Sequence, residues 1–236
     1  MSIAPSFAAI ESRIAAACTA ARRPRESVML LAVSKTKPAP VIAAAAALGQ
    51  HAFGENYVQE ALPKIAELAA LGLDWHHIGP IQSNKTADIA QHFAWAHGVD
   101  RLKIAQRLAD QRPAHLPPLN VCVQVNVSGE ASKSGCAPQD ALPLCRAVAQ
   151  LPRLRLRGLM ALPAPAATDE DARASFRTMH SLFVALRAEH AELDTLSMGM
   201  SDDFEQAIAE GSTLIRVGTA LFGKRGAGKT ASEPAS

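Results

Sequence analysis

The stretch Val28-Met-Leu-Leu-Ala-Val-Ser-Lys35 decides how this chain is expected to fold. Its aliphatic residues run without interruption to Ser34, which is typical of a strand that is buried on both faces of a parallel sheet. Lys35 follows at the carboxyl end of this strand, where α/β folds bind their ligands. A lysine beside an apolar wall can become an amine nucleophile toward an aldehyde. A lysine that ends the strand and points into solvent is also compatible with this pattern.

The strand-then-helix unit recurs along the chain, after an amphipathic leading helix that ends near Pro24. We expect strands over residues 28–35, 51–56, 74–78, 93–99, 120–127, 154–162, 195–198 and 213–217. We expect helices over residues 41–48, 57–71, 101–111, 138–150, 169–192 and 202–210, and a further one that ends near residue 92.

Eight such units with short connections predict a parallel sheet, and 236 residues suit a closed (β/α)8 TIM-type barrel. The strand over 93–99 is the weakest of the eight, so a doubly wound open sheet is the alternative. We expect one domain over residues 1–223 and a flexible tail over residues 224–236.

Composition argues against several classes of partner. The net charge of +2, without a lysine or arginine block, gives no reason to expect nucleic acid or an anionic membrane. The sequence has no run of 18 apolar residues, so we expect no membrane span. Glu11 and Arg13 interrupt any signal-like segment at the start. The four cysteines lack CxxC spacing and zinc-finger histidines, so we predict no metal site and reduced thiols in the cytoplasm.

In a barrel, the polar residues that follow each strand meet at one mouth. Gly218 and Thr219 follow the last strand and precede a short helix, and this arrangement commonly binds phosphate through free backbone N–H groups. Arg216 lies within that apolar strand and needs an acceptor, so it marks either a buried ion pair or a ligand contact. Ser201 could give a hydroxyl to the same site or could cap the helix that follows it.

Asn56 and His77 are weaker candidates for the same mouth, and His77 could equally be a core histidine that the backbone satisfies. A Schiff-base lysine, a phosphate cradle and an arginine that can face a ring nitrogen together describe a site for pyridoxal 5′-phosphate (PLP). Such an arginine would keep the pyridine nitrogen unprotonated and so restrain carbanion chemistry. Lys37 is the rival amine, but it precedes Pro38 in the turn, whereas Lys35 directly ends the strand.

One motif argues for a different ligand. The stretch Gly223-Lys-Arg-Gly-Ala-Gly-Lys-Thr230 fits the phosphate-binding pattern GxxxxGK[ST]. That mechanism needs a helix after the loop and an acidic metal partner on another strand. Only residues 231–236 follow, with a proline among them, so we expect a basic tail and no nucleotide site.

Seven ordered segments carry a resemblance to a known family. They are LAVSKTKP (31–38), FGENYVQE (53–60), WHHIGPIQSNK (75–85), VNVSGEASKSG (125–135), GLMALPAP (158–165), LSMGMSDDFEQAI (196–208) and RVGTALFG (216–223). On these segments the chain resembles the pyridoxal phosphate homeostasis protein family. The resemblance implies a (β/α)8 barrel of PLP fold type III, similar to the N-terminal domain of alanine racemase. It also implies an internal aldimine on Lys35, with phosphate and ring contacts at Ser201, Arg216, Gly218 and Thr219.

The resemblance further implies a carrier or regulator of PLP (vitamin B6) and amino-acid pools, in which no residue has a catalytic role. We expect apo PLP-dependent enzymes as recipients, a monomer and a cytoplasmic location. Two other functions stay open. One is a weak PLP-dependent amino-acid racemase or another PLP enzyme, and the other is a Schiff-base aldolase that acts on a sugar phosphate without any cofactor.

Overall fold

In the computed structural model, residues 3–130, 133–163 and 168–223 are described. The leading helix α1 (Ala4–Ala20) is followed by strands that alternate with helices. The strands are β1 (Met29–Val33), β2 (Ala52–Glu55), β3 (Asp74–His77), β4 (Trp95–Val99), β5 (Leu119–Val125), β6 (Leu154–Ala161), β7 (Thr195–Ser197) and β8 (Leu214–Val217). The helices after them are α2 (Ala39–Ala46), α3 (Val58–Glu67), α4 (Thr86–His92), α5 (Leu102–Gln111), α6 (Pro138–Ala149), α7 (Asp169–Glu189), α8 (Phe204–Ala209) and α9 (Thr219–Phe222).

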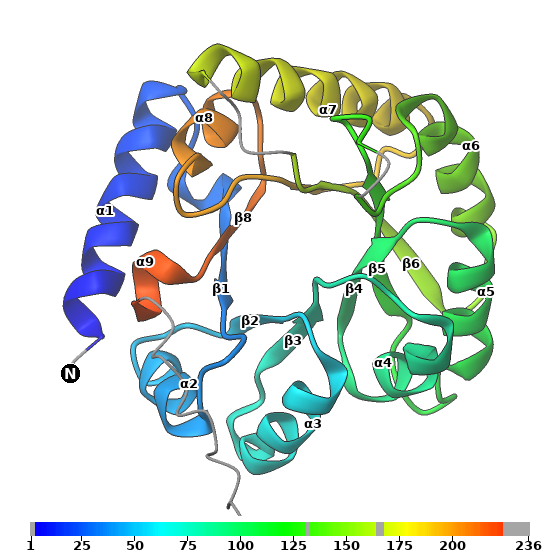
Figure 1. The fold of residues 1–236 in the computed structure, drawn as a ribbon, viewed down its shortest axis with the longest axis horizontal. Coiled ribbons are helices and arrows are strands. Elements are labelled where there is room, and N and C mark those ends of the chain that lie inside the picture. Colours follow the sequence, from blue (N-terminus) through cyan, green and yellow to red (C-terminus); the bar gives the residue numbers. More distant parts are fainter. Residues whose placement is uncertain (1–2, 131–132, 164–167, 224–236) are drawn as a thin grey trace, which may run out of the picture.

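The eight strands pair in chain order, all parallel, and β1 pairs with β8 to close the barrel. Figure 1 shows the helices as a ring around these strands, with α1 beside α8 and α9. The closed barrel is therefore confirmed and the open sheet is wrong. The expected tail over 224–236 lies outside the described residues, and so does the GxxxxGK[ST] motif except for Gly223.

Several expected boundaries shift for local reasons. β1 ends at Val33 because the next four residues form a turn, in which the Lys37 N–H donates to the Ser34 carbonyl over 3.0 Å. The helix expected over 57–71 is divided into α3 and a 3₁₀ turn (Ala69–Leu71), which ends at Gly72 with a left-handed φ of 59°. Such a backbone angle suits glycine and stops a helix.

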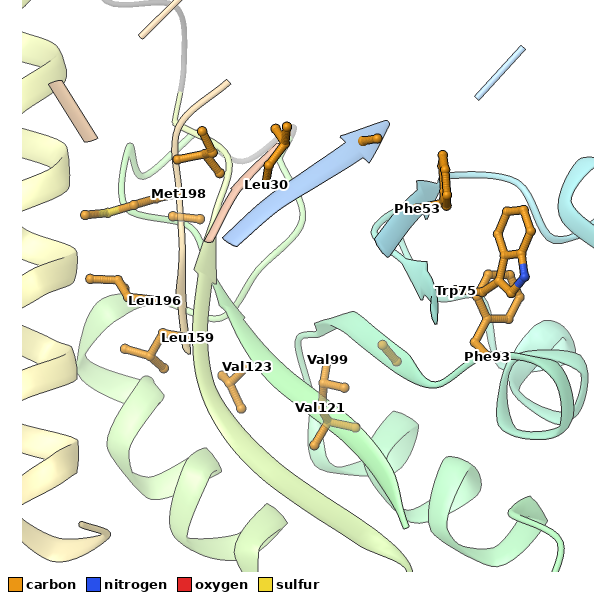
Figure 2. Packing of buried hydrophobic residues seen from close by; sticks show 14 of the residues in the cluster. Leu30, Phe53, Trp75, Phe93, Val99, Val121, Val123, Leu159, Leu196 and Met198 are labelled. Carbon is orange, nitrogen blue, oxygen red and sulfur yellow. The ribbon is translucent and has the colours of Figure 1, made fainter. Parts of the chain in front are cut away.

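Strand side chains are buried on both faces, as the apolar run of β1 predicted. Those that face the helices form the main core, which Figure 2 shows for Leu30, Phe53, Leu159 and others. Alternate residues point into the barrel, where Leu31 packs with Ile78 and Leu214. Burying one such side chain stabilises the fold by about 1.5–3 kcal/mol. The barrel is thus a filled core and not a pore.

Polar rings share the barrel interior with these aliphatic side chains. His76 stacks on Trp95 with 5.0 Å between ring centroids, and its Nδ1 lies 2.9 Å from Nε2 of His97. Burial lowers the pKa of His76 to about 3 and that of His97 well below its usual value. Both imidazoles are therefore neutral at physiological pH, which permits one ring nitrogen to donate to the other.

The leading helix covers the outside of the barrel with one apolar face. Phe7, Ile10, Ile14 and Cys18 are buried there, and the Phe7 ring meets Phe222 of α9 edge-on at 5.8 Å. Throughout the described ranges, no helix has both the length and the apolar character that crossing a membrane requires. All four cysteines are free thiols.

Candidate functional site

A cavity of about 310 Å³ opens at the carboxyl ends of the strands. Its lining residues are Val33, Lys35, Thr36, Lys37, Asn56, Ile78, Leu162, Met200, Ser201, Asp202, Arg216, Gly218, Thr219 and Gly223. The volume falls at the lower end of the range for small-molecule sites, about 300–1,000 Å³. Six of the seven residues that the sequence singled out line this cavity, and His77 does not.

The turn after β1 carries two lysines with different surroundings. Val33 and Lys35 line the cavity, whereas the Ser34 hydroxyl between them donates to Glu55 Oε1, away from the cavity. The Lys37 ammonium donates to the carbonyl oxygens of Phe222 (3.0 Å) and Gly223 (3.2 Å), so it ties the turn to the end of α9. Lys37 therefore has a structural task that accounts for its position.

Arg216 of β8 provides a buried cation in the cavity wall. Its side chain donates to Ser197 Oγ (2.7 Å) and to the carbonyl oxygen of Ala161 (2.8 Å), and the residue is only 3% exposed. Burial lowers its pKa to about 10, which still leaves the guanidinium charged at neutral pH. Both acceptors are neutral, and no ion pair of Arg216 is found among the described residues, although the Asp203 carboxylate lies near enough to favour the charged guanidinium. The charge remains available to a ligand.

The end of β8 forms the expected loop-and-helix arrangement. Gly218 precedes α9, and a Cβ at Gly218 would lie 3.2 Å from both Cβ and the carbonyl oxygen of Val33. This close approach explains why the position is a glycine. The first N–H groups of a helix have no partner within it and attract anions. Thr219, at the start of α9, adds an exposed hydroxyl to the same rim.

Ser201 lies in the loop after β7 and is half-buried in the cavity wall. The next helix, α8, begins at Phe204, and Asp203 occupies its N-cap position. The Met200 N–H donates to Oδ1 of Asp203 over 2.6 Å, which fixes this loop. The capping role considered for Ser201 is therefore wrong.

Asn56 and His77 lie close together, but their side chains point to different sides of the barrel wall. The Asn56 Oδ1 is buried in the cavity wall and has no donor among the described residues. His77 lies on the helix side of β3, with its ring edge-on to Phe93 at 5.5 Å. Burial lowers the pKa of His77 to about 4, and a hydrogen bond to the Asn56 backbone opposes that shift. His77 is a neutral core histidine and not a residue of the cavity.

The predicted site residues did not include the apolar part of the site. Val33, Ile78, Leu162 and Met200 supply an apolar wall, while Asp202 adds a carboxylate at the rim. The alternation that places Lys35 inward also places Val33 inward, and it could have revealed Val33 in advance. Met200 and Asp202 belong to an irregular loop, where no periodicity signals orientation.

This arrangement suits one kind of ligand. A primary amine, a buried guanidinium and a helix start surround a partly apolar cavity of small-molecule size. The unsatisfied Asn56 Oδ1 also needs a hydrogen-bond donor, which a ligand hydroxyl could supply. The site therefore fits an anionic, planar aldehyde that carries a phosphate and a hydroxyl, as PLP does.

Known proteins resemble this chain along nearly its whole length. Residues 6–226 match the family model described as alanine racemase, N-terminal domain. The chain is 62% identical over 230 residues to a pyridoxal phosphate homeostasis protein of Pseudomonas aeruginosa, covering 98% of this chain and 99% of that protein. It is 54% identical over 226 residues to the one of Escherichia coli strain K12, covering 94% and 97%.

Solved structures extend the comparison to three dimensions. PipY of Synechococcus elongatus, solved with PLP bound, is 38% identical and superposes with a TM-score of 0.77 over 91% of this chain and 100% of that chain. An alanine racemase of Clostridium difficile, only 14% identical, has a TM-score of 0.73 over 94% of this chain and 56% of its own, which shows a shared fold. By its closed barrel and by its identity with these relatives along nearly its whole length, the chain belongs to the pyridoxal phosphate homeostasis protein family.

Proposed function

We propose that this chain binds PLP at the mouth of the barrel and serves PLP (vitamin B6) and amino-acid homeostasis as a carrier. The observation that supports this best is the meeting of Lys35, Arg216 and Gly218 around one cavity. These residues belong to opposite ends of the sequence, and together they offer an amine, a cation and an anion-binding helix start. Relatives of the same length carry the homeostasis name, and PipY was solved with PLP bound.

Lys35 is the proposed attachment point. PLP supplies an electrophilic aldehyde, and condensation with the Lys35 amine forms a C=N bond and releases one water molecule. Lys37 lies further along the turn, which its ammonium ties to the end of α9, whereas Lys35 lies closer to the end of β1. Ser201, Gly218 and Thr219 would hold the phosphate.

The remaining polar groups would orient the ring. Arg216 carries donors and no acceptor, so a ring nitrogen that faces it would have to stay unprotonated. Asn56 would accept a hydrogen bond from the ring hydroxyl through its unsatisfied Oδ1. The role proposed for His77 is indirect, since its contact is with the Asn56 backbone.

As a carrier, the protein would release PLP to apo PLP-dependent enzymes, and we propose that it does so as a monomer in the cytoplasm. Four free thiols, three of them buried, suit a reducing compartment. The half-buried position of Lys35 at an open rim suits exchange better than permanent enclosure.

Borohydride trapping tests the proposal. Purified protein is incubated with PLP, reduced with borohydride and digested, and the modified lysine is found by peptide mapping. We expect the reduced PLP adduct on Lys35 in the wild-type protein. The adduct should be absent in Lys35→Ala and present in Lys37→Ala. A mark on another lysine in the unchanged protein, or none at all, would overturn the proposed attachment.

A further inference from the structure

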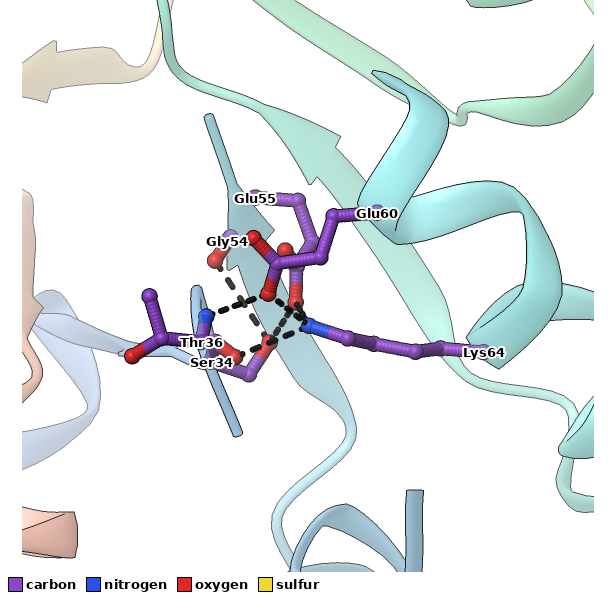
Figure 3. Close-up of polar contacts among 6 residues, drawn as sticks. All are labelled: Ser34, Thr36, Gly54, Glu55, Glu60 and Lys64. Atoms are coloured by element: carbon purple, nitrogen blue, oxygen red, sulfur yellow. Dashed lines mark hydrogen bonds and ion pairs between the residues drawn. The ribbon is translucent and has the colours of Figure 1, made fainter. Parts of the chain in front are cut away.

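A buried cluster of charges lies behind the turn that carries Lys35, on the side away from the cavity. Figure 3 shows Glu60 and Lys64 reaching from α3 to Ser34, Thr36 and the strand end at Glu55. The Lys64 ammonium donates to the Ser34 carbonyl (3.2 Å), to Glu55 Oε1 (3.0 Å) and to Glu60 Oε1 (2.6 Å). All three of its donors therefore have acceptors.

The cluster holds both peptide groups that flank Lys35. The carbonyl oxygen of Ser34, on the amino side, accepts from Lys64. The N–H of Thr36, on the carboxyl side, donates to Glu60 Oε1. Two groups from one helix thus fix the backbone immediately before and after the proposed attachment point.

The backbone held in this way is strained. Thr36 has a φ of 65°, in the left-handed region that β-branched residues avoid. It occupies the third position of the turn closed by the Lys37 N–H and the Ser34 carbonyl. Without an external contact the turn would relax, and the direction of the Lys35 side chain would change with it.

The cluster itself is firmly anchored. Glu55 is fully buried, and its Oε1 accepts from Ser34 Oγ over 2.6 Å as well as from Lys64. Burial raises the pKa of Glu55, whereas its hydrogen bonds from Ser34 and Lys64 lower it. The side chain of Glu60 is 30% exposed, so it can be replaced without leaving a cavity in the core.

We propose that Glu60 and Lys64 are positioning residues, which aim Lys35 into the cavity by holding the strained peptide groups on either side of it. The inference rests on the proposed function, since it concerns how Lys35 meets the aldehyde. Misplacing a reacting atom by about 1 Å can slow a reaction about a hundredfold. The cluster should therefore control the rate of covalent attachment more than the affinity for the ligand.

Two ligands separate these effects. PLP is mixed with the protein and its attachment is followed by absorbance and by borohydride trapping at Lys35. Pyridoxine 5′-phosphate has the same ring and phosphate without the aldehyde, so its affinity, measured by calorimetry, reports on the cavity alone. For Glu60→Ala we expect attachment of PLP to slow about tenfold or more, with the affinity for pyridoxine 5′-phosphate within about twofold of the unchanged protein.

Matched variants identify the cause. Glu60→Gln keeps an oxygen for the Thr36 N–H and should restore most of the rate. Thr36→Gly removes the strain, so Glu60→Ala should slow attachment far less in that background than alone. Glu67→Ala, which removes an exposed carboxylate from the same helix, is the control and should leave the rate unchanged.

The outcomes are distinct. Attachment to Lys35 at the unchanged rate in Glu60→Ala would overturn the positioning role and leave the proposed function intact. An equal loss of affinity for pyridoxine 5′-phosphate would also overturn it, because the cluster would then support the whole cavity. If PLP does not attach to Lys35 in the wild-type protein, the proposed function itself is refuted.

Discussion

Replacing His77 by phenylalanine should flatten the dependence of stability on pH. The ring lies between β3 and the helix layer, 1% exposed, and its folded-state pKa is about 4 against a usual value of 6.5. A histidine with a lowered folded pKa contributes its full stabilisation above pH 6.5. That contribution is lost as the pH falls from 6.5 toward 4, because the unfolded chain then binds the extra proton.

The size of this effect follows from the two pKa values. Between pH 8 and pH 5, this one imidazole costs the folded state about 2 kcal/mol. His76 and His97 are also buried and neutral, so the free energy of unfolding of the wild-type protein should fall by more than about 2 kcal/mol between pH 8 and pH 5, about 2 kcal/mol of it from His77. In His77→Phe, the free energy of unfolding should fall by about 2 kcal/mol less over the same pH interval.

Urea unfolding at the two pH values, followed by circular dichroism, measures the difference. The comparison uses the change with pH within each protein, so a constant effect of the substitution, such as the lost contact with the Asn56 backbone, cancels. His115→Phe, which removes an exposed imidazole, serves as the control. If His77→Phe lost as much stability between pH 8 and pH 5 as the unchanged protein, His77 would not be the neutral core group described above.

Two further substitutions test the cavity. Gly218→Val should weaken PLP binding at least about tenfold, because a Cβ there already lies 3.2 Å from Val33 and a branched side chain would fill the helix start; calorimetry that finds the affinity unchanged would refute the cradle. Arg216→Ala should lower PLP retention on a desalting column with the far-ultraviolet spectrum intact, and equal retention would mean that the guanidinium does not face the ligand.

The fold could be predicted because its signals are local. Several strands, such as β1 and β6, are short and largely apolar runs, and the size of the chain suits eight strand-then-helix units. The weak strand β4 also forms, because Trp95 and Ala96 are buried and pair with β3. These tertiary contacts are not visible in the local sequence. Boundaries were less predictable, because turns such as Ser34–Lys37 depend on one hydrogen bond each.

The cavity was predictable to the extent that strand ends converge. Lys35 and Gly218 could be found because each follows a recognisable strand, and Arg216 because it is a charged residue within one. For His77 the structure favours the core alternative: Ile78 faces the cavity, so its neighbour in β3 faces the helices. One register position separates a residue of the cavity from a residue of the core.

The cluster behind Lys35 lay beyond such reasoning. Glu55 ends β2, and nothing in the sequence distinguishes it from a polar residue at the mouth of the barrel. Only the placement of α3 against the barrel brings Lys64 to Glu55 and gives that buried carboxylate a positively charged partner.

The residues at the end of β1 face two different parts of the structure. Val33 and Lys35 face the cavity, while Ser34 and the peptide groups beside it face α3. A ligand can therefore come and go on one side of the strand while the other side keeps its contacts. A carrier needs this separation, because the empty protein must hold its lysine ready for the next aldehyde. An outer layer of hydrogen bonds that does not involve the cavity meets that need, and Glu60 and Lys64 supply it.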